Sequence, residues 1–416
     1  MMLTWHPNQW SIAMPAHVPL FHDVLDRITS VVPYLRKTAR TRLALLVTGI
    51  LLAQSCVEAR VAEELLVLEL THATMAESIA RRLRRIFNDD RLDPQTCYEP
   101  ALAHLVDWQA VLATNQPVLL LLDESADTDI IHLVRISLAY RGSSVPLVWA
   151  VWEQNVAQPA GFYWQTLDAL LERAAALIPA GAPVTVLADR GYEAPAVIDR
   201  LTARGWHWVI RLRTKASTRV LDQQGREHAL TTVFGRRLQH RGQRCKFRGK
   251  LFKDAGWRTV SVVALWAERE DAALAIITDF PPSYSVLPIY RKRFWIECGF
   301  RTDKSAGWQW EACQVRDLTH HRVLLLAMAW ASVITLCLGA EEAEATLAKQ
   351  QHHPPRRPEH ARFSLFSLGL KRLRAFLHHP HTWHLRWLLP DLNAPSWNQQ
   401  WLTLQRRQYL GQTVRP

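Results

Sequence analysis

The chain has 416 residues, of which 49% are hydrophobic and 21% charged, and this balance excludes an intrinsically disordered protein. A single hydrophobic core stops growing at about 250–300 residues, so we expect more than one domain. Lysine and arginine outnumber aspartate and glutamate by 50 to 38, and the resulting charge of +12 favours a polyanionic partner, either nucleic acid or an anionic membrane surface. Six scattered cysteines without zinc-type spacing favour a reduced, intracellular protein.

Residues 1–112 predict a helical region. Within it, residues 74–88 have the pattern of a basic amphipathic helix. Its apolar positions recur at helical spacing: Ile79, Leu83, Ile86 and Phe87. The opposite face carries Arg81, Arg82, Arg84 and Arg85. Such a face either lies along DNA phosphates or is simply a solvated surface, and the local pattern favours neither.

From residue 117 the pattern changes to strands alternating later with helices. We expect strands at 117–123, 131–140, 145–152, 184–188 and 206–213. Helices are expected at 164–179 and 194–204. This order describes a mixed α/β sheet whose first three strands are antiparallel.

Two of these apolar strands end in an acid, Asp123 and Asp189. Neighbouring strands would bring both carboxylates to one edge of the sheet. Phosphodiester chemistry on nucleic acid often uses divalent metals, which need converging carboxylates. Asp127 and Asp129 compete with Asp123, but we expect them in the turn after the strand.

Residues 214–288 interrupt the pattern and predict a β-rich insertion. The segment 235–253 carries eight cationic residues and no acid, and strands follow at 258–266 and 273–279. A helix is then expected from about 287 to 304. The uncharged run 323–340 is expected to be a buried core helix, with a membrane span as the alternative. Residues 346–416 form a basic, proline- and tryptophan-rich C-terminal region.

The stretch 290–304 supplies a third carboxylate, Glu297. On one helix, five of its side chains would share a face: Tyr290, Arg293, Glu297, Arg301 and Lys304. One carboxylate, one phenol and three cations on a face fit a surface that meets DNA beside a metal site.

The spacing Tyr290-(2)-Arg293-(3)-Glu297-(6)-Lys304 resembles the Y-(2)-R-(3)-E-(6)-K signature of bacterial insertion-sequence transposases. That resemblance implies a DDE enzyme with an RNase H-like catalytic core. Asp123, Asp189 and Glu297 would be the catalytic residues and would hold two Mg²⁺ ions, with Mn²⁺ as a substitute. One metal would activate water or a DNA 3′-hydroxyl, and the other would stabilise the leaving oxygen.

The resemblance also implies the partners and the organisation of the chain. Double-stranded DNA would be bound as terminal inverted repeats and target, by a homodimer, in the bacterial cytoplasm and at the nucleoid. The domains would be a DNA-binding region at 1–112, a catalytic core at 113–213 and 289–345, the insertion at 214–288 and the C-terminal region at 346–416. The expected DNA contacts are Tyr290, Arg293, Arg301, Lys304, Arg190, Arg81, Arg85, Arg244 and Lys246.

Three alternatives stay open. An RNase H-like nuclease would cut DNA without joining it. A transposase-derived DNA-binding protein would have lost catalysis, although all three carboxylates are present. A membrane-associated protein would use residues 323–340 as its anchor.

Overall fold

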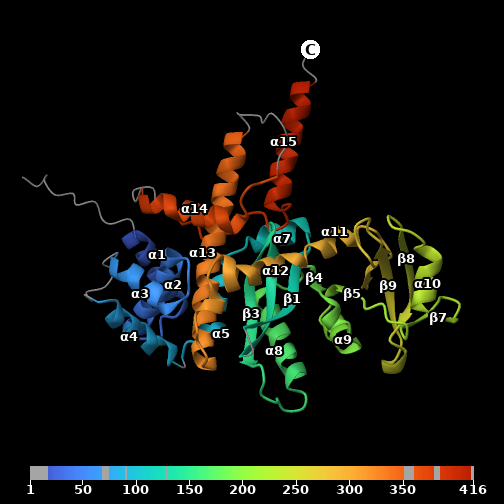
Figure 1. Ribbon diagram of the computed structural model, residues 1–416, viewed down its shortest axis with the longest axis horizontal. Helices are drawn as coiled ribbons and strands as arrows, with labels where there is room; N and C mark the ends of the chain where they lie inside the picture. The colour runs from blue at the N-terminus through green and yellow to red at the C-terminus, as the bar shows by residue number, and fades with distance from the viewer. Residues whose placement is uncertain are drawn as a thin grey trace, which may run out of the picture.

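Figure 1 shows the computed structural model of the chain. The structure describes residues 17–67, 75–89, 91–127, 130–350, 360–378 and 385–413. Helices cluster at the N-terminal end, and one large sheet runs from the middle of the molecule to its far end.

The N-terminal part is helical in every segment that the structure describes, as predicted. Its helices are α1 (His17–Val31), α2 (Lys37–Ala53), α3 (Glu58–Val67), α4 (Ala76–Phe87), α5 (Pro94–Cys97), α6 (Glu99–Leu102) and α7 (Trp108–Thr114). The basic amphipathic helix is α4, whose apolar face is buried while its four arginines are exposed.

The first half of the sheet follows the predicted strand order. Its strands are β1 (Val118–Asp127), β2 (Ile131–Tyr140), β3 (Ser143–Glu153), β4 (Val184–Ala188) and β5 (His207–Arg211). Strands β1, β2 and β3 form an antiparallel meander, and β4 and β5 add in parallel beside β1, giving the order β3-β2-β1-β4-β5. This arrangement is RNase H-like, and the expected fold class is confirmed.

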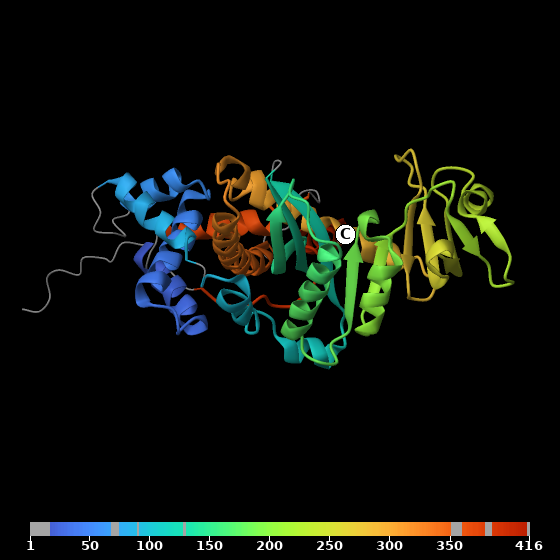
Figure 2. The same ribbon diagram turned by 90° about the horizontal axis from the view of Figure 1, so that it is seen from below.

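Helices cover both faces of this half. Helices α8 (Phe162–Leu177) and α9 (Pro195–Ala203) lie along one face, as Figure 2 shows. Helix α12 (Phe294–Arg301) packs on the other face, against β1, β2 and β3. The two faces of β1 therefore meet different helices, and this difference decides what its side chains contact.

The insertion continues the same sheet. Its elements are β6 (Arg219–Leu221), β7 (Glu227–Ala229), α10 (Leu230–Arg237), β8 (Arg244–Leu251), β9 (Arg258–Leu265) and β10 (Leu274–Thr278). Strand β10 pairs antiparallel with β5, with Ile277 opposite Ile210, so all ten strands share hydrogen bonds from edge to edge. The two predicted strands are β9 and β10. Strand β8 was not predicted, although its charged and non-charged residues alternate with the period of a strand.

The helix expected over 287–304 is divided. It consists of α11 (Val286–Arg291), a turn at Lys292 and Arg293, α12, and a π-helical turn (Thr302–Ala306). The expectation of one continuous helix was therefore wrong, because a turn and a wider helical turn reset the 3.6-residue period.

Helix α13 (Leu318–Gln350) contains the apolar run 323–340. It is long and apolar enough to cross a membrane, and α2 with α3 passes the same test as a bent pair. The apolar window of α13 is entirely buried inside the protein, as expected of a core helix.

The C-terminal region also joins the core. Helices α14 (Leu365–His378) and α15 (Trp397–Thr413) lie on either side of residues 385–396, which bond to the N-terminal helical region. The backbone N–H of Leu389 donates to the carbonyl of Leu105 at 2.7 Å, and the Trp387 indole donates to the carbonyl of Ala101 at 3.1 Å. The tail therefore contributes to the packed interior.

Candidate active site

The register of the sheet brings Asp123 and Asp189 together. Strands β1 and β4 are parallel neighbours, and the last pair in their ladder is Leu122 opposite Ala188. Each aspartate is the next residue after that pair, and adjacent strands lie about 4.8 Å apart. The apolar run ends at Asp123, but β1 itself continues to Asp127, which pairs with Ile131. Our expectation that Asp127 lies in the turn was wrong, and Asp129 is outside the described residues.

Asp189 begins the short turn η1 (Arg190–Tyr192), and its Oδ1 accepts a 2.6 Å hydrogen bond from the N–H of Gly191. This local bond fixes the rotation of the carboxylate after the strand ends. Asp189 lies just after the last hydrogen-bonded pair of β4, so the turn as well as the strand fixes its side chain.

Glu297 reaches the same place from α12. A close approach of this helix to the sheet depends on Gly299, because a Cβ atom there would collide with the Ser144 Oγ of β3. The glycine lets the helix lie low enough for Glu297 to share a partner with Asp123.

That shared partner is Arg293. Its Nη1 donates to the Oδ2 of Asp123 at 3.2 Å, while its Nη2 is bonded to the Oε1 of Glu297. The Arg293 and Asp123 side chains are 14% and 16% exposed, and that of Glu297 is 40% exposed. One guanidinium thus bridges a carboxylate from the sheet and a carboxylate from the helix.

The pKa of Asp123 depends on burial and on the neighbouring charges. Its pKa is raised to about 6, chiefly by burial. The N–H of Glu124 and the charge of Arg293 lower it, whereas the charges of Asp189 and Glu297 raise it. Both other carboxylates are therefore within electrostatic reach of Asp123.

The three acids are of the right chemical type to bind a metal ion, but their side chains are not grouped as metal ligands in this structure. Three carboxylates are the oxygen ligands that Mg²⁺ prefers. Among the residues that the structure describes, no three His, Cys, Asp or Glu side chains are grouped closely enough to hold a metal ion. Arg293 lies between two of the acids, and it neutralises part of the repulsion that a bound cation would otherwise relieve.

A buried ion pair anchors the end of α12. Arg135 of β2 donates through Nη1 to the Oδ2 of Asp303 at 2.6 Å, and both residues are 4% exposed. The Arg135 guanidinium also lies 4.4 Å from the centre of the Phe300 ring. Sequence reasoning missed this pair. Asp303 stands inside the signature stretch, but it falls off the face that we considered.

The residues predicted to contact DNA near the acids differ in exposure. Arg190 and Arg301 are exposed, and Lys304 is half-buried with its Nζ 3.6 Å from Glu311. Tyr290 is 6% exposed, and its buried hydroxyl has no hydrogen-bond partner among the described residues.

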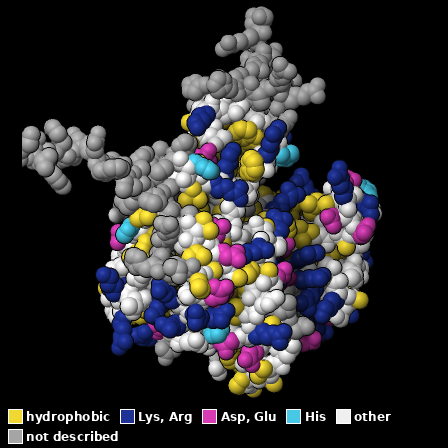
Figure 3. Space-filling model, turned by 60° about the vertical axis from the view of Figure 1, so that its left-hand side comes forward, with side chains coloured by type: hydrophobic (Ala, Val, Ile, Leu, Met, Phe, Trp, Pro, Cys, Tyr) yellow, Lys and Arg dark blue, Asp and Glu magenta, His cyan; other side chains and the backbone are white. Residues whose placement is uncertain are grey.

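The other predicted DNA contacts lie on two distant elements. Arg81 and Arg85 are exposed on α4. Arg244 and Lys246 of β8 place their cationic groups 4.5 Å and 5.2 Å from the ring of Tyr284. Figure 3 shows Lys and Arg side chains gathered in bands on one face of the molecule.

The comparisons with known proteins name a family. Residues 106–334, more than half of the chain, match the transposase DDE domain family. No curated protein matches the chain. The match spans β1, β4, the insertion and α12, and so includes all three acids of the candidate site. The chain belongs to the family of transposase DDE domains.

Proposed function

We propose that this transposase binds the terminal inverted repeats of its element, cleaves phosphodiester bonds there and transfers the DNA strand to a target. The observation that carries the proposal is that acids from three elements lie at one edge of the sheet. Asp123 and Asp189 follow the last β1–β4 pair, and Arg293 links Asp123 to Glu297.

Asp123, Asp189 and Glu297 would hold Mg²⁺, for which Mn²⁺ is an expected substitute. When bound, the metal supplies Lewis-acid chemistry to the attacking and leaving oxygens of the phosphodiester. Asp123 must be ionised to act as a ligand, and burial opposes that ionisation. A cation beside the three carboxylates favours their charged forms, as Arg293 already does in part.

DNA would reach this edge of the sheet past cationic side chains. Arg190 and Arg301 are exposed beside the acids, and Arg293 would exchange a carboxylate for a phosphate oxygen, to which guanidinium groups bind bidentately. Arg244 and Lys246 on β8, and Arg81 and Arg85 on α4, would contact the flanking duplex. Tyr290 and Lys304 would join the contact once DNA uncovers the phenol and competes with Glu311.

Two ends must be joined in one reaction, so we propose a homodimer on DNA. The two alternative activities predict different products. A nuclease would cut without joining, and a DNA-binding protein without catalysis would leave the DNA intact.

The test is metal-dependent cleavage and joining of DNA that carries the gene's own flanking inverted repeats, with Mg²⁺ or Mn²⁺. Asp189→Asn and Glu297→Gln are compared with wild type, and DNA affinity is measured for each. Cleavage and joining by wild type, lost in both variants while binding persists, supports the proposal. Binding without cleavage in all three proteins contradicts it.

Asp168→Asn is the matched control. This acid belongs to the same catalytic half, is 41% exposed, and bonds an arginine, Arg200, at 2.8 Å, but it lies on α8 away from the three acids. Its variant should cleave at the wild-type rate.

A further inference from the structure

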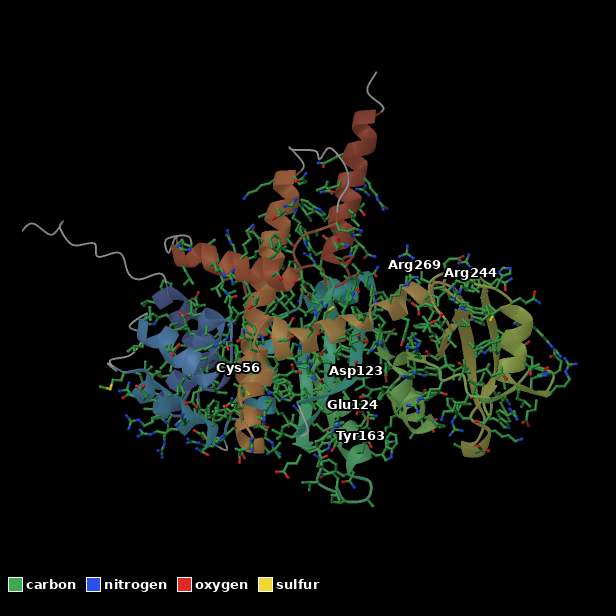
Figure 4. The ribbon with its side chains drawn as sticks, in the orientation of Figure 1. Cys56, Asp123, Glu124, Tyr163, Arg244 and Arg269 are labelled. Atoms are coloured by element: carbon green, nitrogen blue, oxygen red, sulfur yellow. The ribbon has the colours of Figure 1, made fainter. Side chains whose placement is uncertain are left out.

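A second carboxylate stands directly behind Asp123. Glu124 is the next residue in β1, so its side chain points to the opposite face of the sheet, toward α8. Figure 4 labels Asp123, Glu124 and Tyr163, which lie close together in the middle of the molecule.

Glu124 ties three secondary-structure elements together. Its Oε1 accepts a 2.5 Å hydrogen bond from the hydroxyl of Tyr163 on α8, and its Oε2 lies 2.9 Å from Nε2 of His132 on β2. The other ring nitrogen of His132 lies 3.1 Å from Oε1 of Gln154. Both carboxylate oxygens of Glu124 are therefore engaged, and by different elements.

The histidine is itself held in place. His132 is directly opposite Trp152 in the β2–β3 ladder, and the two rings stack with their centres 4.4 Å apart. Its pKa is raised, first by the hydrogen bond to Glu124, and that of Glu124 is lowered by its hydrogen-bonding partners despite burial. Both shifts favour a charged pair.

The position of Glu124 bears directly on Asp123. Asp123 precedes Glu124 in the backbone of β1, so the contacts that hold Glu124 against α8 and β2 also hold the strand at Asp123. Asp189 lies across from this point of β1, next to the last β1–β4 pair.

We propose that Glu124 is a positioning residue, which fixes β1 from behind so that Asp123 is held beside Asp189. The inference rests on the proposed function. Groups that orient metal ligands from behind typically change metal affinity or activity by about 10–100-fold when they are removed.

The experiment measures Mn²⁺ affinity by calorimetry without DNA, and single-turnover cleavage with saturating DNA, for wild type, Glu124→Ala and Glu124→Gln. We expect Glu124→Ala to lower both by about 10–100-fold while DNA affinity is unchanged. Glu124→Gln should recover part of each loss, because the amide oxygen still accepts a hydrogen bond from Tyr163.

The matched control is Asp222→Asn. Asp222 also bonds a histidine, His228, at 2.9 Å, and its side chain is likewise partly buried, but it lies in the insertion. Its variant should retain wild-type Mn²⁺ affinity and cleavage. If Glu124→Ala fails to fold, Tyr163→Phe removes a single hydrogen bond from the same carboxylate and should weaken Mn²⁺ binding in the same direction.

Wild-type Mn²⁺ affinity and cleavage in Glu124→Ala, or in Tyr163→Phe if that variant replaces it, would overturn the inference and leave Glu124 as a structural residue. That outcome differs from a failure of the proposed function, in which the wild-type protein itself neither binds Mn²⁺ nor cleaves DNA.

Discussion

The two halves of the ten-stranded sheet have different characters. The half from β3 to β5 is covered by helices, and it contains enclosed ion pairs such as Arg135 with Asp303. The half from β10 to β7 carries its charge on exposed side chains, with Arg244, Lys246, Arg248 and Lys250 at alternate positions of β8. One continuous sheet thus contains buried ion pairs in its catalytic half and a row of solvent-exposed cations in its insertion half.

The largest expected difference is in catalysis. Asp189→Asn should lower the cleavage rate at least roughly 1,000-fold, about 4 kcal/mol, because one of three metal ligands loses its charge. Arg248→Gln in the second half should leave the rate at saturating DNA unchanged. Single-turnover kinetics would measure both, and equal losses would show that the halves do not divide chemistry from binding.

The next difference is in stability. Asp303→Ala should lower the free energy of unfolding by about 3 kcal/mol, because the Arg135 charge would stay buried without its partner. Asp271→Ala breaks the pair with Arg241 in the insertion, where the acid is fully exposed, and should leave the free energy of unfolding essentially unchanged. Urea unfolding of the two variants tests this contrast, which equal values would contradict.

For DNA affinity, we expect the larger effect from substitutions in the insertion half of the sheet. Replacing Arg244 and Lys246 together by glutamine should lower affinity about tenfold and reduce the slope of log affinity against log salt by about 2, because each cation neutralises one phosphate at about 0.9 per contact. A salt titration of binding measures both quantities. An unchanged slope would mean that β8 does not touch the phosphate backbone.

The smallest expected effect is a pH dependence at the border of the halves. The pKa of Glu193 is raised to about 7, mainly by burial, and its Oε2 accepts a hydrogen bond from the N–H of Arg213. The folded state therefore favours the protonated acid. Its contribution to stability is present below the unfolded pKa of about 4.5 and is lost as the pH rises to about 7.

Glu193→Gln should remove the loss of stability that accompanies ionisation of Glu193 at high pH. Because the carboxylate is partly exposed, we expect the variant to be more stable than wild type by only about 1 kcal/mol at pH 8, and equal to it at pH 4. Unfolding curves at the two pH values decide. A variant that is less stable than wild type at pH 8 would show that the charge of Glu193 stabilises the fold.

The sequence predicted the parts of the fold that rest on local patterns. Apolar runs predicted β1 to β5, and their order predicted a mixed α/β sheet with Asp123 beside Asp189. The RNase H-like core was implied by the resemblance of residues 290–304 to a transposase signature. The bridge from Arg293 to Asp123 spans 170 positions and depends on how low α12 lies on the sheet, so no local pattern could reveal it. The turn at Lys292 and Arg293 was missed because its backbone angles remain close to helical.

Other features needed the tertiary structure. The pairing of β10 with β5 makes the insertion part of the main sheet, which its own sequence does not indicate. The network around Glu124 joins β1, β2 and α8, and only the register that sets Ala126 opposite His132 brings the histidine within reach.

The pairing of the tail with the N-terminal helices has a consequence for synthesis. Leu105 and Leu389 are hydrogen-bonded neighbours, yet at about 5–20 residues per second the second is made roughly 15–60 s after the first. Until then the apolar surface around Ala101 and Leu105 lacks its native cover, and Trp387 in particular is missing from it. A nascent or prematurely terminated chain therefore becomes more prone to aggregation the longer translation takes. Slow codons before the tail would lower the yield of folded protein without changing a single residue.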